Sequence, residues 1–295
     1  MDRCSRARCV LALLTLLSCG GPPAGSGADL APASPPVLRV ATWNVHDLFD
    51  AEDRVVPPGE RDLVPSPAEV ETKLERVAAV LRRVDADVVV LQEVENAAIL
   101  AALAARAGYP EARLVEGADP RGIDVALLSR RAVLAYVSHQ ADRDGDGRPL
   151  WPRDCVEAHV DAGGGRRLVV VASHFSSALS DDGTRRAAQA ARLRELADAA
   201  AASGAKVLAG GDLNDGSGSA ALAPLLGDGA WVEPAAAGPL DATWTWADGG
   251  RREVLDHLAV PRASAGAVLS VEVTGGADVS VASDHRPVVL DVRMD

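Results

Sequence analysis

Short apolar runs recur along the chain from residue 37 to its end, and this repetition most restricts the fold. Each run has the length and residue types of a strand, and turns or helical patterns separate the runs. Many short strands with few helices favour two packed sheets with helices outside them over a purely parallel doubly wound sheet. The runs are Val37–Thr42, Val88–Leu91, Val125–Leu128, Val133–Val137, Leu168–Ala172, Val207–Ala209, Leu255–Val260, Val268–Val273 and Val288–Val292.

Three segments carry helical patterns. The best defined begins at Ser66, which can cap the helix, because Pro67 takes the first helical position and Glu69 completes a capping box. Two further helices are expected over Ala97–Ala107 and Gly183–Ala202. Strands and helices therefore alternate through one α/β domain that spans residues 37–295.

Residues 1–18 have the pattern of a signal peptide. Three arginines precede the apolar run Val10–Leu17, which is too short to span a bilayer as a mature helix. The run ends in Ser18-Cys19-Gly20, which resembles the bacterial lipobox, where a peptidase cuts before a lipid-bearing Cys. The alternative is an ordinary signal peptide that ends near Cys19.

Residues 19–36 follow as a lipid-anchor Cys and a flexible linker, because Gly, Pro, Ala and Ser cannot bury enough surface to fold. The sequence thus predicts an exported lipoprotein of the bacterial cell envelope, on the outer membrane or the cell surface. We expect a monomer that meets the membrane through its lipid anchor only. Cys155 then has no disulfide partner, and its place in an alternating run predicts a packed thiol.

The net charge of −12 argues against a broad basic surface for holding nucleic acid. An acidic hydrolase can still process DNA transiently, and its carboxylates can bind a hard divalent cation, which prefers oxygen ligands.

Two polar motifs follow or precede apolar strands. Gly210-Gly211-Asp212-Leu213-Asn214 leaves a buried run, and Asp212 and Asn214 project to the same side at a period of two. Ser283-Asp284-His285 stands just before the last run, where a carboxylate beside an imidazole can bind a metal or tune the ring. Taken alone, either motif is also what an ordinary polar turn looks like.

Similar residues stand at the ends of other predicted strands, namely Thr42-Trp43-Asn44, Gln92-Glu93 and Ser173-His174-Phe175, with Asp256-His257 inside a late strand. In order and spacing these motifs resemble the endonuclease/exonuclease/phosphatase superfamily, which includes DNase I-like nucleases, sphingomyelinases and inositol polyphosphate phosphatases. The resemblance spans Val37 to Asp295. It implies a four-layered α/β sandwich, two packed mixed β-sheets flanked by helices, with the active site at one end.

The resemblance also implies roles for these residues. Glu93 would bind Mg²⁺ or Mn²⁺, and Asn44 beside it would hold the metal shell or a phosphate oxygen. Asp284 would complete the shell of the metal or of the histidine. Asp212 and Asn214 would orient and activate water or handle the leaving oxygen. The remaining catalytic residues are a histidine that donates to a phosphate oxygen, a histidine that contacts the scissile phosphate, and the carboxylate that fixes the tautomer of the latter: His174, His285 and Asp256.

The chain departs from the family pattern in two places. Many members have Asn where this chain has Ser173, and many DNA-repair relatives have Tyr near Arg121-Gly122-Ile123-Asp124, which argues against abasic-site repair. Arg121 could bind a phosphate, and Asp124 could support His174. An equally plain interpretation is a surface Arg–Asp pair.

Asp142, Asp144 and Asp146 alternate and are followed by Gly147, as at the start of a calcium loop. The Glu expected at the twelfth position is Arg153 here, so a solvated acidic turn is the favoured alternative to Ca²⁺ binding.

The sequence therefore predicts an exported, metal-dependent phosphodiesterase, in the first place a DNase I-like endonuclease with nucleic acid as substrate. His174-Phe175-Ser176-Ser177 resembles the loop of secreted bacterial nucleases. A phosphatase or a phospholipid phosphodiesterase, sphingomyelinase-like or inositol-phosphate-like, is the enzymatic alternative. A lipoprotein that only binds is disfavoured, because Glu93, His174, Asp212 and His285 all keep the chemistry that catalysis needs.

Overall fold

The computed structural model describes residues 35–52 and 64–295. The signal peptide expected over residues 1–18, the lipidated Cys19 and nearly all of the linker 19–36 lie outside the described residues. The first strand begins at Val37.

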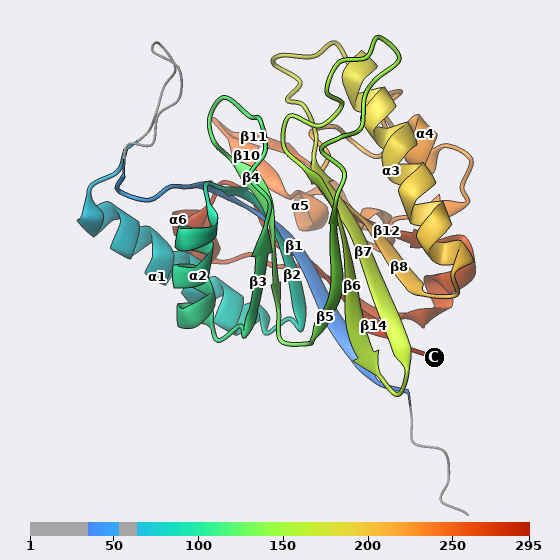
Figure 1. Ribbon diagram of the computed structural model, residues 1–295, viewed down its shortest axis with the longest axis horizontal. Coiled ribbons are helices and arrows are strands. Elements are labelled where there is room, and N and C mark those ends of the chain that lie inside the picture. Colours follow the sequence, from blue (N-terminus) through green and yellow to red (C-terminus); the bar gives the residue numbers. More distant parts are fainter. Residues whose placement is uncertain (1–34, 53–63) are drawn as a thin grey trace, which may run out of the picture. The chain divides into compact units, whose positions relative to one another are not determined.

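Two six-stranded sheets form the centre of the domain (Figure 1). Both are mixed, because β1 and β2 run parallel, as do β7 and β8, while the other neighbours run antiparallel. In order across the first sheet, the strands are β13 (Val268–Val273), β14 (Val288–Arg293), β1 (Val37–Leu48), β2 (Val88–Val94), β4 (Asp124–Ser129) and β3 (Glu111–Leu114). Across the second they are β5 (Val133–Ser138), β6 (Cys155–Gly163), β7 (Arg166–His174), β8 (Lys206–Asp212), β12 (Asp256–Pro261) and β9 (Trp231–Val232).

Alternate residues of the central strands face two different cores. In β1, Leu38 and Val40 pack between the sheets, whereas Ala41 and Trp43 pack outward against helices. The inner core is completed by the facing residues of the second sheet, among them Val170 and Leu208. Because both faces of these strands are covered, the strands are apolar along most of their length, which explains the continuous runs in the sequence.

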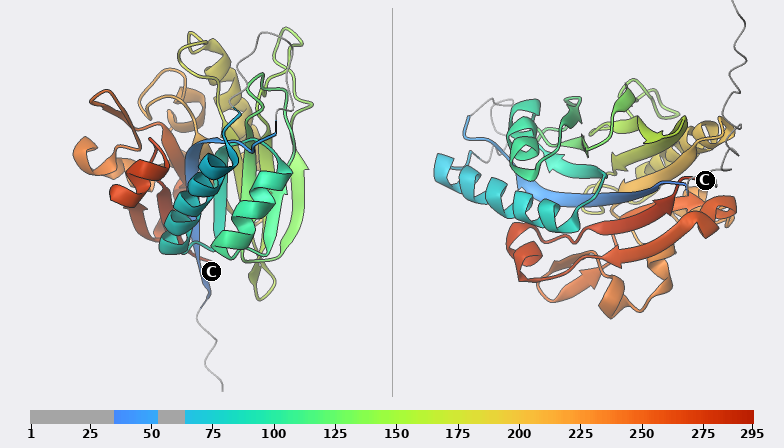
Figure 2. Two further views of the ribbon diagram at one scale, coloured as in Figure 1. Left: turned by 90° about the vertical axis from the view of Figure 1, so that its left-hand side faces the viewer. Right: turned by 90° about the horizontal axis from the view of Figure 1, so that it is seen from below.

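Helices cover the outer face of each sheet and complete four layers (Figures 1 and 2). The left view of Figure 2 looks onto α1 (Pro67–Val84) and α2 (Ala97–Ala107), which pack on the first sheet together with α6 (Ala277–Ala282). On the second sheet lie α3 (Thr184–Ala202) and α4 (Ala223–Leu226). The expected four-layered α/β sandwich is confirmed.

The capping box of α1 is formed as predicted, because the Ser66 side chain accepts from the Glu69 amide and the Glu69 carboxylate accepts from the Ser66 amide. Trp244 follows the short helix α5 (Leu240–Thr243), and Trp246 starts a separate hairpin of β10 (Trp246–Asp248) and β11 (Arg251–Glu253). Gly249 and Gly250, both at positive φ, make its turn.

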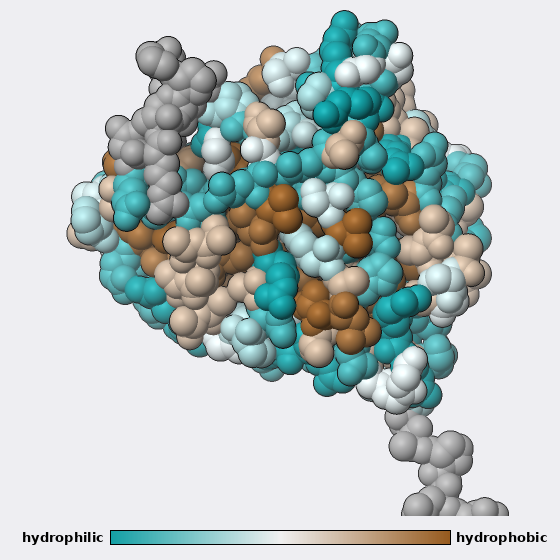
Figure 3. All heavy atoms as spheres, viewed as in Figure 1, coloured by the Kyte–Doolittle hydropathy of each residue, from teal (hydrophilic) through white to brown (hydrophobic). Residues whose placement is uncertain are grey.

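Hydrophobic residues on the face shown in Figure 3 form small groups separated by hydrophilic ones. Cys155 is free and buried, as expected. Within the part of the chain that the structure describes, the helices lack the combination of length and apolar character that a membrane crossing requires.

Candidate active site

The polar residues that the sequence placed at the ends of predicted strands lie together at one end of the sandwich. The carboxyl ends of β1, β2, β7 and β8 meet there, together with the amino ends of β12 and β14. A cavity of about 440 Å³ opens at this end. Its lining includes eight of the predicted site residues: Asn44, Glu93, Arg121, His174, Asp212, Asn214, Asp284 and His285.

His285 is held by a buried carboxylate. Its Nδ1 lies 2.7 Å from Oδ2 of Asp256, which is 1% exposed. Burial alone would lower the pKa of His285, but the Asp256 charge and hydrogen bond, with the Asp212 charge, raise it to about 10. His285 is therefore an imidazolium at neutral pH, with Nε2 turned toward Asp212 at 3.9 Å.

Asp212 occupies the centre of the floor. Its Oδ2 accepts from Nδ2 of Asn44 at 2.9 Å and lies 3.4 Å from Nε2 of His174. Burial raises the pKa of Asp212 to about 6, although the nearby charge of His285 opposes this rise. A carboxylate with this pKa is ionised at neutral pH and close to the range in which a general base works best.

The two glycines before Asp212 allow three strands to approach closely. A Cβ at Gly210 would lie 1.9 Å from the His257 carbonyl oxygen of β12, and one at Gly211 would lie 2.0 Å from the Ser173 carbonyl oxygen of β7. Gly211 also has φ +122°. The glycines thereby bring Asp212 level with Asp256 and His174.

His174 is buried and neutral. Burial lowers its pKa well below the ordinary value, and the charge of Arg153 adds to this effect. Among the described residues its Nδ1 has no hydrogen-bond partner. The support expected from Asp124 is thus not formed in this structure, because Asp124 accepts from the Gly117 amide instead. Burial raises the pKa of Asp124 to about 7.

Glu93 and Asn44 form the other half of the floor. Nδ2 of Asn44 bridges Oε1 of Glu93 at 3.3 Å and Oδ2 of Asp212, so two carboxylates converge on one amide. Oε2 of Glu93 accepts from the Asp47 amide at 3.0 Å and lies 3.4 Å from Arg121. Burial alone would raise the pKa of Glu93, but Arg121 and these hydrogen bonds hold it below its ordinary value.

Asn214 is positioned mainly by the loop around it. The backbone N–H of Asn214 donates to Oδ1 of Asp212 at 3.0 Å, and its side-chain Nδ2 donates to the Phe175 carbonyl at 3.0 Å. Arg121 lies at the cavity, where it pairs with Asp47 and Glu93, so the alternative of an unimportant surface pair with Asp124 does not describe it.

His46 and Asp47 were missed by the sequence reasoning. They follow Asn44 where the pairing of β1 with β2 shifts register, and both have positive φ. Nδ1 of His46 lies 2.8 Å from Asp284, and this contact raises the pKa of His46. Although burial opposes it, the same contact lowers the pKa of Asp284 to about 2, with help from the charge of His285.

Strained backbone marks this end of the domain. Five described residues other than glycine have positive φ, and four of them are at the site: His46, Asp47, Glu93 and Asn214. Such conformations cost about 1–3 kcal/mol each and persist where the surrounding structure enforces them. His and Asp are enriched among the non-glycine residues with positive φ, but this preference does not single out His46 and Asp47 among the other His and Asp residues of the chain.

The donor set suits a divalent cation. Among the described residues, Asp212, Asp256 and His285 are the one group of three acidic or histidine side chains whose ligand atoms lie within 4.8 Å of one another. Oδ1 of Asp256 is buried without a hydrogen-bond partner in the described part of the chain. Nδ1 of His285 already contacts Asp256, so Glu93, whose Oε1 lies 3.3 Å from Nδ2 of Asn44, offers a better oxygen ligand for a hard cation than this group does.

The three carboxylates of the predicted calcium loop contact protein groups. Asp142 accepts from Arg192 at 2.8 Å and from Trp151 at 3.2 Å, and Asp144 accepts from two amides of its own turn. Asp146 pairs with Arg148. The structure therefore favours the alternative, a solvated acidic turn.

Comparison with known proteins agrees with this geometry. Residues 41–285 match the model of the Endonuclease/Exonuclease/phosphatase family. No curated protein sequence matches the chain.

Solved structures share the fold. Truncated TDP2 from Caenorhabditis elegans is 18% identical, with 87% of this chain and 98% of that chain covered and a TM-score of 0.62. Sphingomyelinase C from Streptomyces griseocarneus is 21% identical, with 88% and 100% covered and a TM-score of 0.57. The human Nocturnin catalytic domain, solved with a bound sulfate anion, is 15% identical, with 88% and 96% covered and a TM-score of 0.66.

Proposed function

The chain belongs to the endonuclease/exonuclease/phosphatase family, whose members hydrolyse phosphate esters with a divalent metal, and we propose that it is an exported phosphodiesterase that cleaves DNA. The observation that carries the proposal is the pair of imidazoles around Asp212. One of them, His285, is charged at neutral pH, and the other, His174, is neutral. The carboxylate between them is ionised and can take a proton from water.

The residues present account for each part of the reaction. Asp212 accepts a proton from the attacking water, whose oxygen bonds to phosphorus, while the bond from phosphorus to the leaving oxygen breaks and solvent protonates that oxygen. His285 donates to a phosphate oxygen as negative charge grows, and Asp256 keeps the ring oriented. His174 donates from Nε2 to a second oxygen. General acid–base help of this kind is worth about 10²–10⁴-fold.

A divalent ion fits beside these residues. Glu93, with Asn44 and Asp284 nearby, would hold Mg²⁺ or Mn²⁺. When bound, the ion neutralises charge on the phosphate and polarises it toward attack. Arg121, which already contacts Glu93, would add a guanidinium for the same phosphate.

Localisation is part of the proposal. The arginines and the apolar run before Cys19 support export and lipidation in a bacterial cell envelope, with residues 19–36 as a tether. Labelled palmitate should enter the wild-type protein expressed in a bacterial host and should not enter Cys19→Ala. Equal labelling of the two proteins would exclude this anchor.

A phospholipid phosphodiesterase is the second candidate, because one observation favours it. Leu179, at the rim of the cavity, is 99% exposed, and such a side chain can enter a lipid surface. Sphingomyelinase C also has this fold, although at 21% identity the likeness extends to the fold alone.

A substrate panel separates the candidates. We expect the purified protein to nick supercoiled plasmid in the presence of Mg²⁺ and to leave sphingomyelin vesicles intact. EDTA should abolish the nicking. Arg166→Gln, on the β6–β7 hairpin, is the matched control and should nick like the wild type. Rapid release of phosphocholine from vesicles with no DNA cleavage would replace DNA by lipid as the substrate.

A further inference from the structure

A second cavity adjoins the active-site cavity. It has a volume of about 440 Å³ and shares His46, Asp284 and His285 with the first. Its far side is lined by Lys73 of α1 and by Arg286, which follows His285. The reacting centre is therefore connected to a path that leads away from it between α1 and α6.

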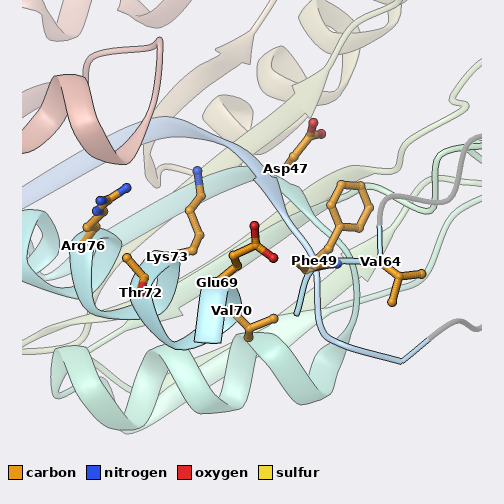
Figure 4. A pocket seen from close by; sticks show the side chains of 9 residues that line it. Asp47, Phe49, Val64, Glu69, Val70, Thr72, Lys73 and Arg76 are labelled. Carbon is orange, nitrogen blue, oxygen red and sulfur yellow. The ribbon is translucent and has the colours of Figure 1, made fainter. Parts of the chain in front are cut away.

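A third cavity of about 610 Å³ continues this path along α1 and shares Lys73 with the second. Figure 4 shows Lys73 and Arg76 leaving α1 on the same side, with Asp47 and Glu69 nearby. We call the second and third cavities together the α1–α6 groove. The volume of these two cavities exceeds what a single phosphate group would fill.

Three cations line the α1–α6 groove, and among the described residues none of them has a carboxylate at ion-pair distance. Nζ of Lys73 donates to the Ala282 carbonyl at 2.6 Å, which leaves two of its three N–H groups for another ligand. Within the described part of the chain, Arg76 donates only to the Val281 carbonyl, at 3.3 Å. Arg286 lies on the ring of Trp244, with its Cζ 3.2 Å from the ring centroid.

The carboxylates of the same groove are already engaged. Glu69 closes the capping box of α1, Asp284 contacts His46, and Asp47 pairs with Arg121. Asp284 and Asp47 thus each face a basic side chain, whereas Glu69 keeps its charge because its capping-box partners are neutral. The three cations face no carboxylate at ion-pair distance among the described residues, so Lys73 and Arg286 favour an anion within an otherwise acidic protein.

Trp244 fixes the orientation of Arg286. A guanidinium stacked on an indole keeps its N–H edge free, and that edge matches two oxygens of one phosphate. Arg252 also approaches Trp244, with its Cζ 5.1 Å from the ring centroid.

We propose that the α1–α6 groove binds the phosphate backbone of a nucleic-acid strand next to the cleaved bond, through Lys73 and Arg286. This inference rests on the proposed function, which it deepens, because it requires a substrate with several phosphates in a row. Lys73 and Arg286 act as specificity-determining residues, and the hydrolysis itself uses the active-site residues.

Binding of a short, fluorescein-labelled, single-stranded phosphorothioate oligonucleotide tests the groove without requiring cleavage. Fluorescence anisotropy with Mg²⁺ should give a Kd about tenfold higher for Lys73→Gln and for Arg286→Gln than for wild type. The slope of log Kd against log KCl concentration should fall by about 0.7 for each, since each variant loses one phosphate contact. Arg286→Lys should recover part of the slope.

Arg166→Gln is the matched control, since it removes one exposed charge at the other end of β7. A wild-type Kd and slope in Lys73→Gln and Arg286→Gln, or changes no larger than those of Arg166→Gln, would overturn the groove assignment. Thermal melting verifies that each variant folds. If Arg286→Gln does not fold, the binding data for Lys73→Gln still test the groove. Plasmid nicking by the wild type tests the proposed function independently of the groove. Absence of nicking would reject DNA cleavage, whatever the anisotropy shows about binding.

Discussion

Two buried imidazole–carboxylate pairs each have one member on β12, at the adjacent residues Asp256 and His257. They differ in whether the imidazole keeps a ring nitrogen for a substrate. Asp256 holds Nδ1 of His285 at 2.7 Å, and Nε2 of His285 remains at the cavity beside Asp212. His257 pairs through Nδ1 with Glu233, and its Nε2 contacts the Asp215 carbonyl at 2.8 Å.

Both imidazoles have a raised pKa, about 10 for His285 and about 9 for His257. A raised pKa therefore does not identify the catalytic residue. The difference is that both nitrogens of His257 are committed to the protein, whereas His285 keeps one for a substrate. We infer that the first pair serves the reaction and the second fixes the loop after Asp212 on β12.

The largest difference between the pairs is expected in activity. His285→Ala should lower kcat/KM for plasmid nicking by about 10²–10⁴-fold, because the charge that faces the phosphate is lost. His257→Ala, assayed where it is folded, should stay within about tenfold of wild type. Similar losses in the two variants would remove the functional distinction.

Stability should show the opposite order. His257→Ala leaves Glu233 buried without its partner, and breaking a buried ion pair in this way costs about 3–5 kcal/mol. His285→Ala should cost less, because water from the cavity can reach Asp256. Urea unfolding measures both free energies, and an equal or larger loss for His285→Ala would contradict the assignment.

Partner carboxylates should affect the pH profile differently. In Asp256→Asn, His285 loses the charge that raises its pKa, so the alkaline limb of kcat/KM should move from about pH 10 toward the ordinary imidazole value of 6.5. Glu233→Gln should leave this limb in place. An unmoved limb in Asp256→Asn would show that His285 is not the group that titrates.

The smallest effect is a pH dependence of stability. The pKa of His257 is raised on folding, so its contribution is fully present below about pH 6.5 and is lost as the pH rises through about 9. The difference in unfolding free energy between wild type and His257→Gln should shrink over that window. A difference that stays constant from about pH 6 to 10 would argue against a charged His257.

The sequence predicted much of the fold because the central strands are buried on both faces and therefore appear as unbroken apolar runs. It did not predict β3, which is short and partly exposed. Helix α6 was also missed, since six residues give too little periodicity to recognise.

Prediction of the site followed a similar division. Asn44, Glu93, His174 and Asp212 end strands, so an apolar run pointed to each of them. His46 depends on a register shift and on a positive φ, which His adopts more often than most residues but too rarely to be predicted from its type. Lys73 lies on the polar side of α1, and helical periodicity cannot tell which polar residue will meet α6.

The central claim is that Asp212, between a charged and a neutral imidazole, is the base for phosphodiester hydrolysis. Its most direct test is the pH dependence of kcat/KM for bis(p-nitrophenyl) phosphate with Mg²⁺, in wild type and Asp212→Asn. The wild-type kcat/KM should rise through about pH 6, and Asp212→Asn should lose about 10²–10⁴-fold of it together with this acid limb. An Asp212→Asn variant that keeps the limb and a rate within tenfold of wild type would contradict it.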